Sequence, residues 1–257
     1  MKETFIKEIA KVELNNPILI EGFPGLGLVG KIATRFLIKQ LKAERFAYLY
    51  SPHFPYVVIV NKKGSVRLYS GKFYSWKSNN GRNDLILFTG DSQAQTIEGQ
   101  YEISDRLLDF AEGRNVKTII TIGGYRMEAK EKPRVVTAAT NSDLLDRALQ
   151  AGAILSPMGS PIVGTAGLIL GLSRFKKIDA LCLLGETRGY LPDPKAAKSV
   201  LEILQAMFRL DVDLSGLEEE IVKAEKMVTR LQKIEEKRIL QSEETRKEED
   251  KKTTYIS

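Results

Sequence analysis

The chain has 257 residues, of which 43% are hydrophobic, and it carries a net charge of +6 at pH 7. This composition is that of a globular protein with a sizeable core. No apolar run reaches the roughly 18–20 residues that cross a bilayer, and the charged N-terminus lacks a secretory signal, so we expect a cytoplasmic protein without a membrane partner. Lysines and arginines are interleaved with acids along the chain, which argues against a nucleic-acid partner.

The chain contains one cysteine and one histidine. Cys182 lies in the apolar run DALCLLG and is expected in the core, and His53 lies between two prolines, as a turn residue would. A disulfide within the chain is excluded, and a zinc site has almost no ligands to draw on. We therefore expect no metal and no cofactor. The high lysine and glutamate content is compatible with a thermophilic source.

The first predicted element is a short strand at residues 17–20, followed by a helix at residues 26–41 whose apolar residues recur with helical spacing. Three short β-rich runs then follow, separated by turn residues; they are residues 46–50, 56–60 and 66–69. We expect these three runs to pair as an antiparallel meander. Residues 84–88, DLILF, are expected to form a strand that is covered on both faces.

After residue 90 the pattern changes to alternating helices and strands. We expect helices at residues 98–112, 142–151 and 165–172, and strands at residues 116–122, 134–140 and 179–184. Asp193 is the predicted N-cap of a further helix, with Pro194 at its first position. Strands that alternate with helices indicate a mainly parallel sheet covered on both faces.

These elements predict three segments. Residues 1–210 are expected to form one α/β domain, a three-layer α/β/α sandwich of roughly eight strands, whose sheet is mixed because of the meander. Residues 211–240 are expected to form an amphipathic helix with a heptad seam of Leu217, Ile221, Ala224, Val228 and Leu231. Residues 241–257 are rich in charge and are expected to be a disordered tail.

Residues 25–30, GLGLVG, match the dinucleotide fingerprint G-x-G-x-x-G, and Lys31 extends them toward a phosphate loop. Several features argue against a nucleotide site. Four residues separate the strand from the first glycine, the second strand ends without a carboxylate, and Ile32 replaces the Ser or Thr of a phosphate loop. We expect a tight strand–turn–helix corner instead, although the helix N-terminus could still attract an anion. The residues of this structural motif, which could also form an interface, are Gly22, Phe23, Pro24, Gly25, Leu26, Gly27 and Gly30.

Four blocks together resemble the archaeal branch of the proteasome assembly chaperone 2 family. They are EGFPGLGLVGKIA, SPIVGTAGLILGL, DALCLLGET and LPDPKAAKSVLEIL, in the family's order. The resemblance covers about residues 10–210. It implies an α/β/α domain with a topology similar to nucleoside phosphorylases. It also implies a non-catalytic homo-oligomeric chaperone or adaptor, whose partners are copies of itself and proteasome subunits or another assembly chaperone.

Some archaeal members of that family carry a C-terminal signature, a hydrophobic residue followed by tyrosine and a last residue, which docks on the proteasome. Here the chain ends Tyr255-Ile256-Ser257, so the tyrosine is third from last and the signature is not met. These three residues are expected to form a partner-binding tip of a looser kind.

An enzyme on the same fold is the alternative function. Glycine-bearing loops follow several predicted parallel strands, and such loops converge at one edge of a sheet, where ligands bind. Asp91, Arg126, Glu186 and Arg188 lie in these loops and could act on an anionic small molecule. No motif identifies a nucleophile or a base, so we predict no catalytic residues.

Overall fold

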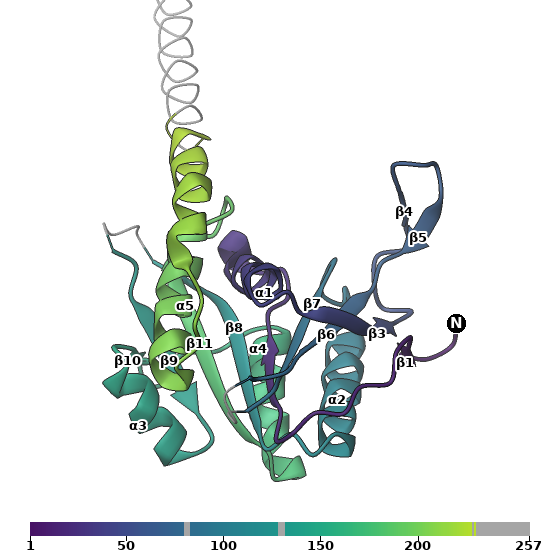
Figure 1. Cartoon of the computed structure of the whole chain (residues 1–257), viewed down its shortest axis with the longest axis horizontal. Helices are drawn as coiled ribbons and strands as arrows, with labels where there is room; N and C mark the ends of the chain where they lie inside the picture. The colour runs from purple at the N-terminus through teal and green to yellow at the C-terminus, as the bar shows by residue number, and fades with distance from the viewer. Residues whose placement is uncertain (80–82, 128–131, 228, 230–257) are drawn as a thin grey trace, which may run out of the picture.

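Nine strands of the described residues form one mixed sheet at the centre of the computed structural model (Figure 1). The structure describes residues 1–79, 83–127, 132–227 and 229. In sheet order the strands are β1 (Phe5–Glu8), β3 (Glu44–Tyr50), β6 (Gly71–Trp76), β7 (Leu85–Gly90), β2 (Ile18–Glu21), β8 (Thr118–Arg126), β11 (Asp179–Thr187), β9 (Val135–Ala139) and β10 (Ile154–Leu155). β7, β2, β8 and β11 run parallel to one another, and β6 and β9 join this group on either side in antiparallel orientation.

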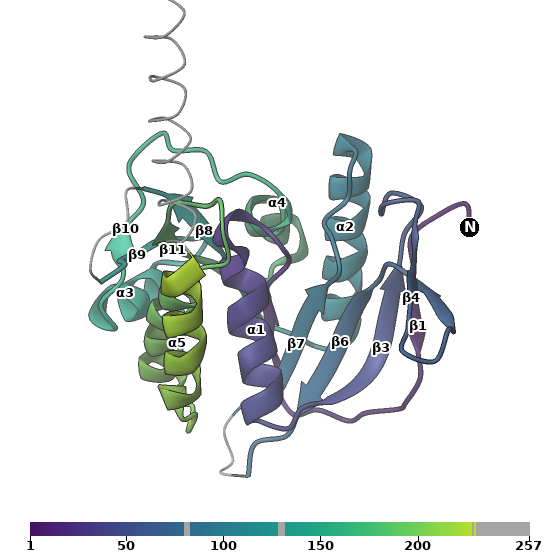
Figure 2. The same ribbon diagram turned by 90° about the horizontal axis from the view of Figure 1, so that it is seen from above.

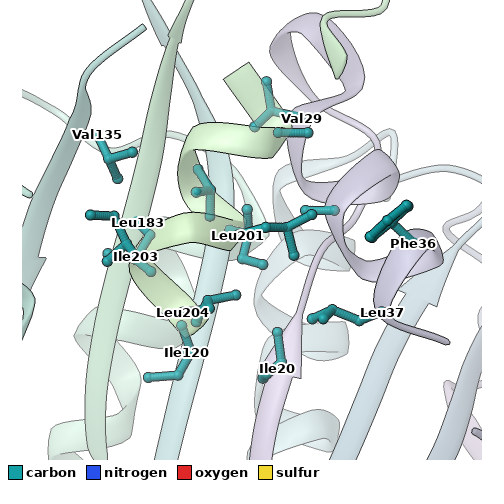
Figure 3. Close-up of a cluster of buried hydrophobic side chains, with 14 of the residues drawn as sticks. Ile20, Val29, Phe36, Leu37, Ile120, Val135, Leu183, Leu201, Ile203 and Leu204 are labelled. Carbon is teal, nitrogen blue, oxygen red and sulfur yellow. The ribbon is translucent and has the colours of Figure 1, made fainter. Parts of the chain in front are cut away.

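Helices cover both faces of the sheet (Figures 1 and 2). One face carries α1 (Val29–Gln40), α3 (Ser142–Gln150) and α5 (Pro194–Phe208), and the other carries α2 (Ile97–Gly113) and α4 (Thr165–Leu172). Successive side chains of a strand point to opposite faces. Ile20 (Figure 3) and Ile18 therefore pack in the cluster with α1 and α5, whereas Leu19 packs in the cluster with α2. The predicted α/β/α sandwich with a mixed sheet is confirmed.

The second half of the chain follows the predicted elements closely. α4 has the predicted bounds, and α5 begins where the predicted cap places it. The backbone N–H of Ala196 donates to Oδ1 of Asp193 at 2.9 Å, and Pro194 occupies the first turn, where a missing N–H costs nothing. The strands β7, β8 and β11 run further than predicted, because each continues through the glycines at its end.

The predicted antiparallel meander is confirmed in the pairing of its second and third runs and wrong in the pairing of its first and second. β4 (Val58–Val60) and β5 (Val66–Leu68) pair with each other and form a separate two-stranded hairpin. The strand that pairs with β3 and continues the sheet to β7 is β6, which the sequence analysis did not identify. Phe73 of β6 packs in the cluster with α2, and Tyr74 and Trp76 pack against the cluster with α1 and α5. Gly71, Lys72 and Ser75 interrupt the apolar pattern, so the strand gives a weak sequence signal.

The segment after α5 packs back onto the domain. A 3-10 turn (Leu214–Leu217) leads into a helix over residues 218–227. Leu217 and Ile221 are buried in the same cluster as α1 and α5. Glu218 and Glu225 form ion pairs with Lys198 and Lys195 of α5, so this helix runs along α5 toward its N-terminus.

Val228, Leu231 and the tail lie outside the described residues, and the division of the chain at residue 210 stays a prediction. None of the described helices combines the length and the apolar character needed to cross a membrane.

Candidate functional site

The candidate site is the edge of the sheet at which the parallel strands end. Because β2, β7, β8 and β11 are parallel, the loops that follow them converge there. The segment between β10 and α4 crosses the same edge (Figure 2). We call residues 22–28, 91–96, 156–164 and 188–193 the loop edge.

Glycines allow the corner between β2 and α1 to be very tight. A Cβ atom on Gly22 would lie 2.2 Å from the carbonyl oxygen of Gly30 and 2.2 Å from Oγ1 of Thr34. A Cβ atom on Gly30 would lie 2.3 Å from the carbonyl oxygen of Ile122 in β8. The first turn of α1 therefore presses directly on β2 and β8, and a side chain at either position would force it away.

The backbone amides of this corner are used inside the protein. The N–H groups of Phe23 and Leu28 donate to Oε1 of Glu21 and to the carbonyl oxygen of Gly25. Gly27 has a φ of 61° and donates to the carbonyl oxygen of Gly189 at 3.3 Å. A phosphate loop directs its amides at the ligand, whereas these amides join the first loop to itself and to residues 188–193.

Phe23 lies in the core rather than on the surface. It is 3% exposed, and its ring packs edge-on against Phe88 at 4.9 Å and Phe54 at 6.4 Å between centroids. Gly90 leaves room for that ring, since a Cβ there would lie 2.0 Å from it. Of the seven motif residues, the one large side chain that the corner leaves partly exposed is Leu26, which covers Gly124 and Gly189.

Gln93 joins three parts of the loop edge, and the sequence analysis did not identify it. Its Nε2 donates to the carbonyl oxygen of Pro24 at 2.9 Å, and its Oε1 accepts from Oγ1 of Thr165 and from Nε2 of Gln100 at 3.2 Å each. The loop after β2 is thereby linked to the first turns of α4 and α2. A single glutamine in a loop gives no sequence signal of such a role.

Large apolar side chains project from and beside this fixed edge. We call Leu26, Met127, Met158, Val163 and Tyr190 the apolar rim. Met158, Val163 and Tyr190 are 103%, 84% and 78% exposed. The guanidinium of Arg126 lies 5.1 Å from the ring centroid of Tyr190 and supports it. These residues belong to loops and strand ends at the same edge of the sheet, and exposed apolar groups are typical of protein-binding surfaces.

Asp91, one of the predicted ligand-loop residues, is engaged by basic side chains. Its carboxylate accepts from Arg67 at 2.5 Å and 3.0 Å and from Lys72 at 3.0 Å. Burial alone would raise the pKa of Asp91, but these hydrogen bonds outweigh it and lower the pKa from 3.8 to about 2. Asp91 is thus an ionised structural anchor.

Glu186 is engaged in the same way on another part of the sheet. It is 3% exposed and accepts from Nε and Nη2 of Arg134 at 2.9 Å and 2.6 Å. Asp91 and Glu186 stand at the ends of strands that β2 and β8 separate, a distance of about 14 Å at the usual strand spacing. Arg126 lies against Tyr190 and Arg188 is exposed, so the structure does not bring the four predicted ligand-loop residues together around one point.

Glu21 is a buried carboxyl group at the end of β2. Burial raises its pKa from 4.5 to about 8, and the hydrogen bond from the N–H of Phe23 only partly offsets this. Its Oε2 has no hydrogen-bond partner among the residues that the structure describes. The side chain is therefore a neutral acid at pH 7.

The described part of the chain contains no group of three or more His, Cys, Asp and Glu side chains that could hold a metal ion. His53 lies in a turn, where its ring nitrogens contact Glu102 at 3.0 Å and Thr96 at 2.9 Å. Cys182 is fully buried, which raises its pKa to about 12 and leaves it an unreactive thiol. Tyr255, Ile256 and Ser257, the predicted partner-binding tip, lie outside the described residues.

Comparisons with known proteins place these features in a family. A sequence model of the PAC2 family matches residues 19–233. Two uncharacterized proteins of Methanocaldococcus jannaschii are each 30% identical to this chain, one over 92% of the chain and 91% of the relative, the other over 94% of both.

Solved structures with the same fold include two proteins of Pyrococcus furiosus. PbaB, described as an archaeal proteasome activator, is 38% identical with a TM-score of 0.86 and covers 90% of this chain and 100% of its own. PbaA, described as an archaeal homolog of proteasome-assembly chaperone, is 27% identical with a TM-score of 0.74 and covers 98% of this chain and 99% of its own.

Proposed function

The chain belongs to the PAC2 family, and from that premise we propose that it is a non-catalytic, homo-oligomeric chaperone or adaptor that binds proteasome subunits. The observation that carries the proposal is the apolar rim, which lies at an edge where several amides of the first loop and the carboxylates of Asp91 and Glu186 already have partners within the protein. Such an edge offers little to a small polar ligand and a preformed apolar surface to a protein.

The likeness to PbaB and PbaA gives the proposal its partner. Both are described in relation to the proteasome, and this chain aligns with nearly all of each. A surface of a few exposed apolar side chains binds weakly on its own, since the binding energy concentrates in a small number of anchors. Several copies in one oligomer would raise the effective concentration and the overall affinity without new contacts.

The direct test measures binding of the full chain to proteasome core particles from the source organism, by co-purification and by surface plasmon resonance. We expect Met158→Glu combined with Val163→Glu to weaken binding by about tenfold or more, because both side chains are exposed anchors of the rim. Phe175→Glu is the matched control, since Phe175 is 83% exposed but lies in the 3-10 turn after α4.

Failure of the unaltered chain to bind any proteasome subunit would refute the proposal. A chain that lacks residues 241–257 separates the two possible contacts. If it binds as tightly as the full chain, the rim is sufficient, whereas a loss assigns part of the contact to the predicted tail.

A further inference from the structure

The hairpin of β4 and β5 presents an apolar face to solvent. It stands away from the sheet on the side of α1 (Figure 1). Val58 pairs with Leu68 and Val60 pairs with Val66, so these four side chains share one face of the hairpin. They are 53%, 49%, 67% and 62% exposed, in that order, and Tyr56, just before the hairpin, is 98% exposed. We call these five residues the hairpin patch.

The face of the hairpin opposite the patch fixes its position relative to the sheet. An isolated two-stranded hairpin is marginally stable in water. Arg67, on the face opposite the patch, makes two hydrogen bonds to Asp91 at the end of β7. This bidentate pair fixes the hairpin to the sheet, so its apolar face is built into the fold rather than left by a loose loop.

The positive charge of the hairpin determines which kind of protein surface is complementary to the hairpin patch. Residues 56–69 contain Lys62, Lys63 and Arg67 and no carboxylate. Lys62 and Lys63 are exposed in the turn beside the patch. A surface that carries carboxylates beside apolar side chains would complement both the lysines and the valines. The complementary surface is therefore apolar and acidic.

The outer face of α2 has this character, and it lies on the opposite side of the sheet (Figure 1). Ile97 and Tyr101, one turn apart, are 76% and 51% exposed. Glu98 and Asp105 are exposed beside them. In all, α2 carries five carboxylates and one cation, Arg106.

We propose that the hairpin patch of one copy of the chain docks head to tail on the α2 surface of a second copy. Val60 and Val66 would cover Ile97 and Tyr101, and Lys62 and Lys63 would face Glu98 and Asp105. Because the two surfaces differ, the contact is heterologous and leaves one surface of each kind free, so it builds a ring or an open chain of copies. The inference rests on the homo-oligomer of the proposed function and names its interface.

A charge exchange tests the pairing on the full chain, with the mass of the assembly measured by native mass spectrometry and light scattering. Lys62→Glu with Lys63→Glu, or Glu98→Lys with Asp105→Lys, places like charges across the interface and should weaken assembly by about tenfold or more. The four substitutions together restore opposite charges and should restore the mass. Lys117→Glu with Lys177→Glu is the control, because both are exposed lysines at the other end of the sheet.

A mixing experiment tests the head-to-tail geometry. Val60→Glu with Val66→Glu disables the hairpin patch, and Ile97→Glu with Tyr101→Glu disables the α2 surface. Each variant alone should be monomeric, and a mixture should give a one-to-one dimer that cannot grow, since one intact contact remains. All substituted positions are exposed, and circular dichroism melting checks that each variant folds.

Several outcomes would overturn the inference. The unaltered chain could be monomeric, or it could form an oligomer whose mass none of these variants changes. A hairpin variant could also assemble again when an unrelated extended peptide is added. A dimer formed by the α2 variant alone would show a symmetric hairpin contact and would also overturn it. Proteasome binding by a monomeric variant would leave the family function standing, so the two proposals can fail separately.

Discussion

Gly22 and Gly30 decide the geometry at which β2 passes into α1. Their Cα atoms face each other so closely that a Cβ on Gly30 would lie 3.1 Å from the Cα of Gly22. The spacing that resembles a nucleotide fingerprint therefore has a mechanical cause. The sequence shows that glycines are needed here, but not what approaches them, because the carbonyl of Ile122 comes from a strand far along the chain.

Replacing Gly30 by alanine tests this packing. We expect Gly30→Ala to lower the free energy of unfolding by about 2 kcal/mol or more, because rigid backbone, not a flexible side chain, fills the space. Denaturant titration gives the value. Gly171→Ala is the control, since its Cβ would meet nothing within 4 Å in α4, and we expect it to stabilise the protein by about 0.5–1 kcal/mol. Equal effects of the two changes would contradict the packing argument.

Glu21 gives the stability of the protein a dependence on pH. Because burial raises its pKa to about 8, the folded chain holds a proton that the unfolded chain releases above about pH 4.5. Between these two values the folded state binds more protons than the unfolded state, so stability falls as the pH rises. The slope for one group is at most about 1.4 kcal/mol per pH unit.

A glutamine at this position would remove that slope. We expect Glu21→Gln to melt at a higher temperature than the unaltered chain at pH 8, and the difference to shrink as the pH falls toward 5. Thermal melts at a series of pH values measure it. Glu13→Gln, at an exposed position outside the proposed interfaces, should leave the pH profile of melting unchanged. A melting difference that does not vary with pH would show that Glu21 is not the titrating group.

The surroundings of a single residue at the site could be predicted from the sequence only where its neighbours in the chain determine them. The fully buried Cys182 and the turn position of His53 follow from their immediate neighbours. The burial of Phe23 does not, because Phe54 and Phe88, which cover it, lie far away in the chain. The same holds for Asp91, whose role depends on Arg67 in the hairpin.

Secondary structure was predictable where a whole element carries one pattern. α1, α2 and α5 each show an apolar stripe with helical spacing, and β7 and β11 are continuous apolar runs. β1 and β6 were missed for the opposite reason. They lie toward one edge of the sheet, and charged and polar residues such as Lys7, Lys72 and Ser75 interrupt their short alternation.

The hairpin of β4 and β5 depends on one ion pair, which can be removed. We expect Arg67→Ala to lower amide hydrogen-exchange protection at Ile59, which lies opposite residue 67 in the hairpin, by about tenfold or more, with little change in the melting temperature of the domain. Arg188→Ala, at an exposed arginine outside the hairpin, should leave the protection unchanged. Unaltered protection in Arg67→Ala would mean that other contacts hold the hairpin.

Protonation of Asp91 should break the same ion pair and loosen the hairpin at low pH. Asp91 has its pKa lowered to about 2 in the folded protein, so its contribution is complete above its ordinary value of 3.8 and is lost as the pH falls through about 2. Exchange protection in the hairpin should decline over this range before the core unfolds.

At the scale of the whole molecule, β–α alternation was enough to predict three layers, because parallel strands require crossovers that cover both faces. The order of strands in the sheet was not predictable. It depends on β6 entering between β3 and β7 and on β2 lying between β7 and β8, and these are pairings between distant segments. The C-terminal helix was predicted as an element, whereas its docking on α5 required the structure.

Two truncations would test where the folded domain ends along the chain. Deleting residues 241–257 should leave the melting temperature unchanged, because the buried core reaches only to Ile221 among the described residues. Deleting residues 214–257 also removes Leu217 and Ile221 and should cost about 4 kcal/mol or more, as loss of two buried aliphatic side chains does. Calorimetry of both chains checks the pair. Unfolding of the shorter deletion would show that the tail supports the domain.

The central position of β2 has a consequence for how the chain is made. β2 is nearly the first strand to leave the ribosome, yet its two neighbours, β7 and β8, come much later. At the usual 5–20 residues per second, the chain from Glu21 to Gly90, the end of the earlier neighbour β7, takes about 3 to 14 s to synthesise. For that time the apolar segment of β2 has no native partner and is open to aggregation. A protein proposed to guide the assembly of others would itself be a client of early chaperones during its synthesis.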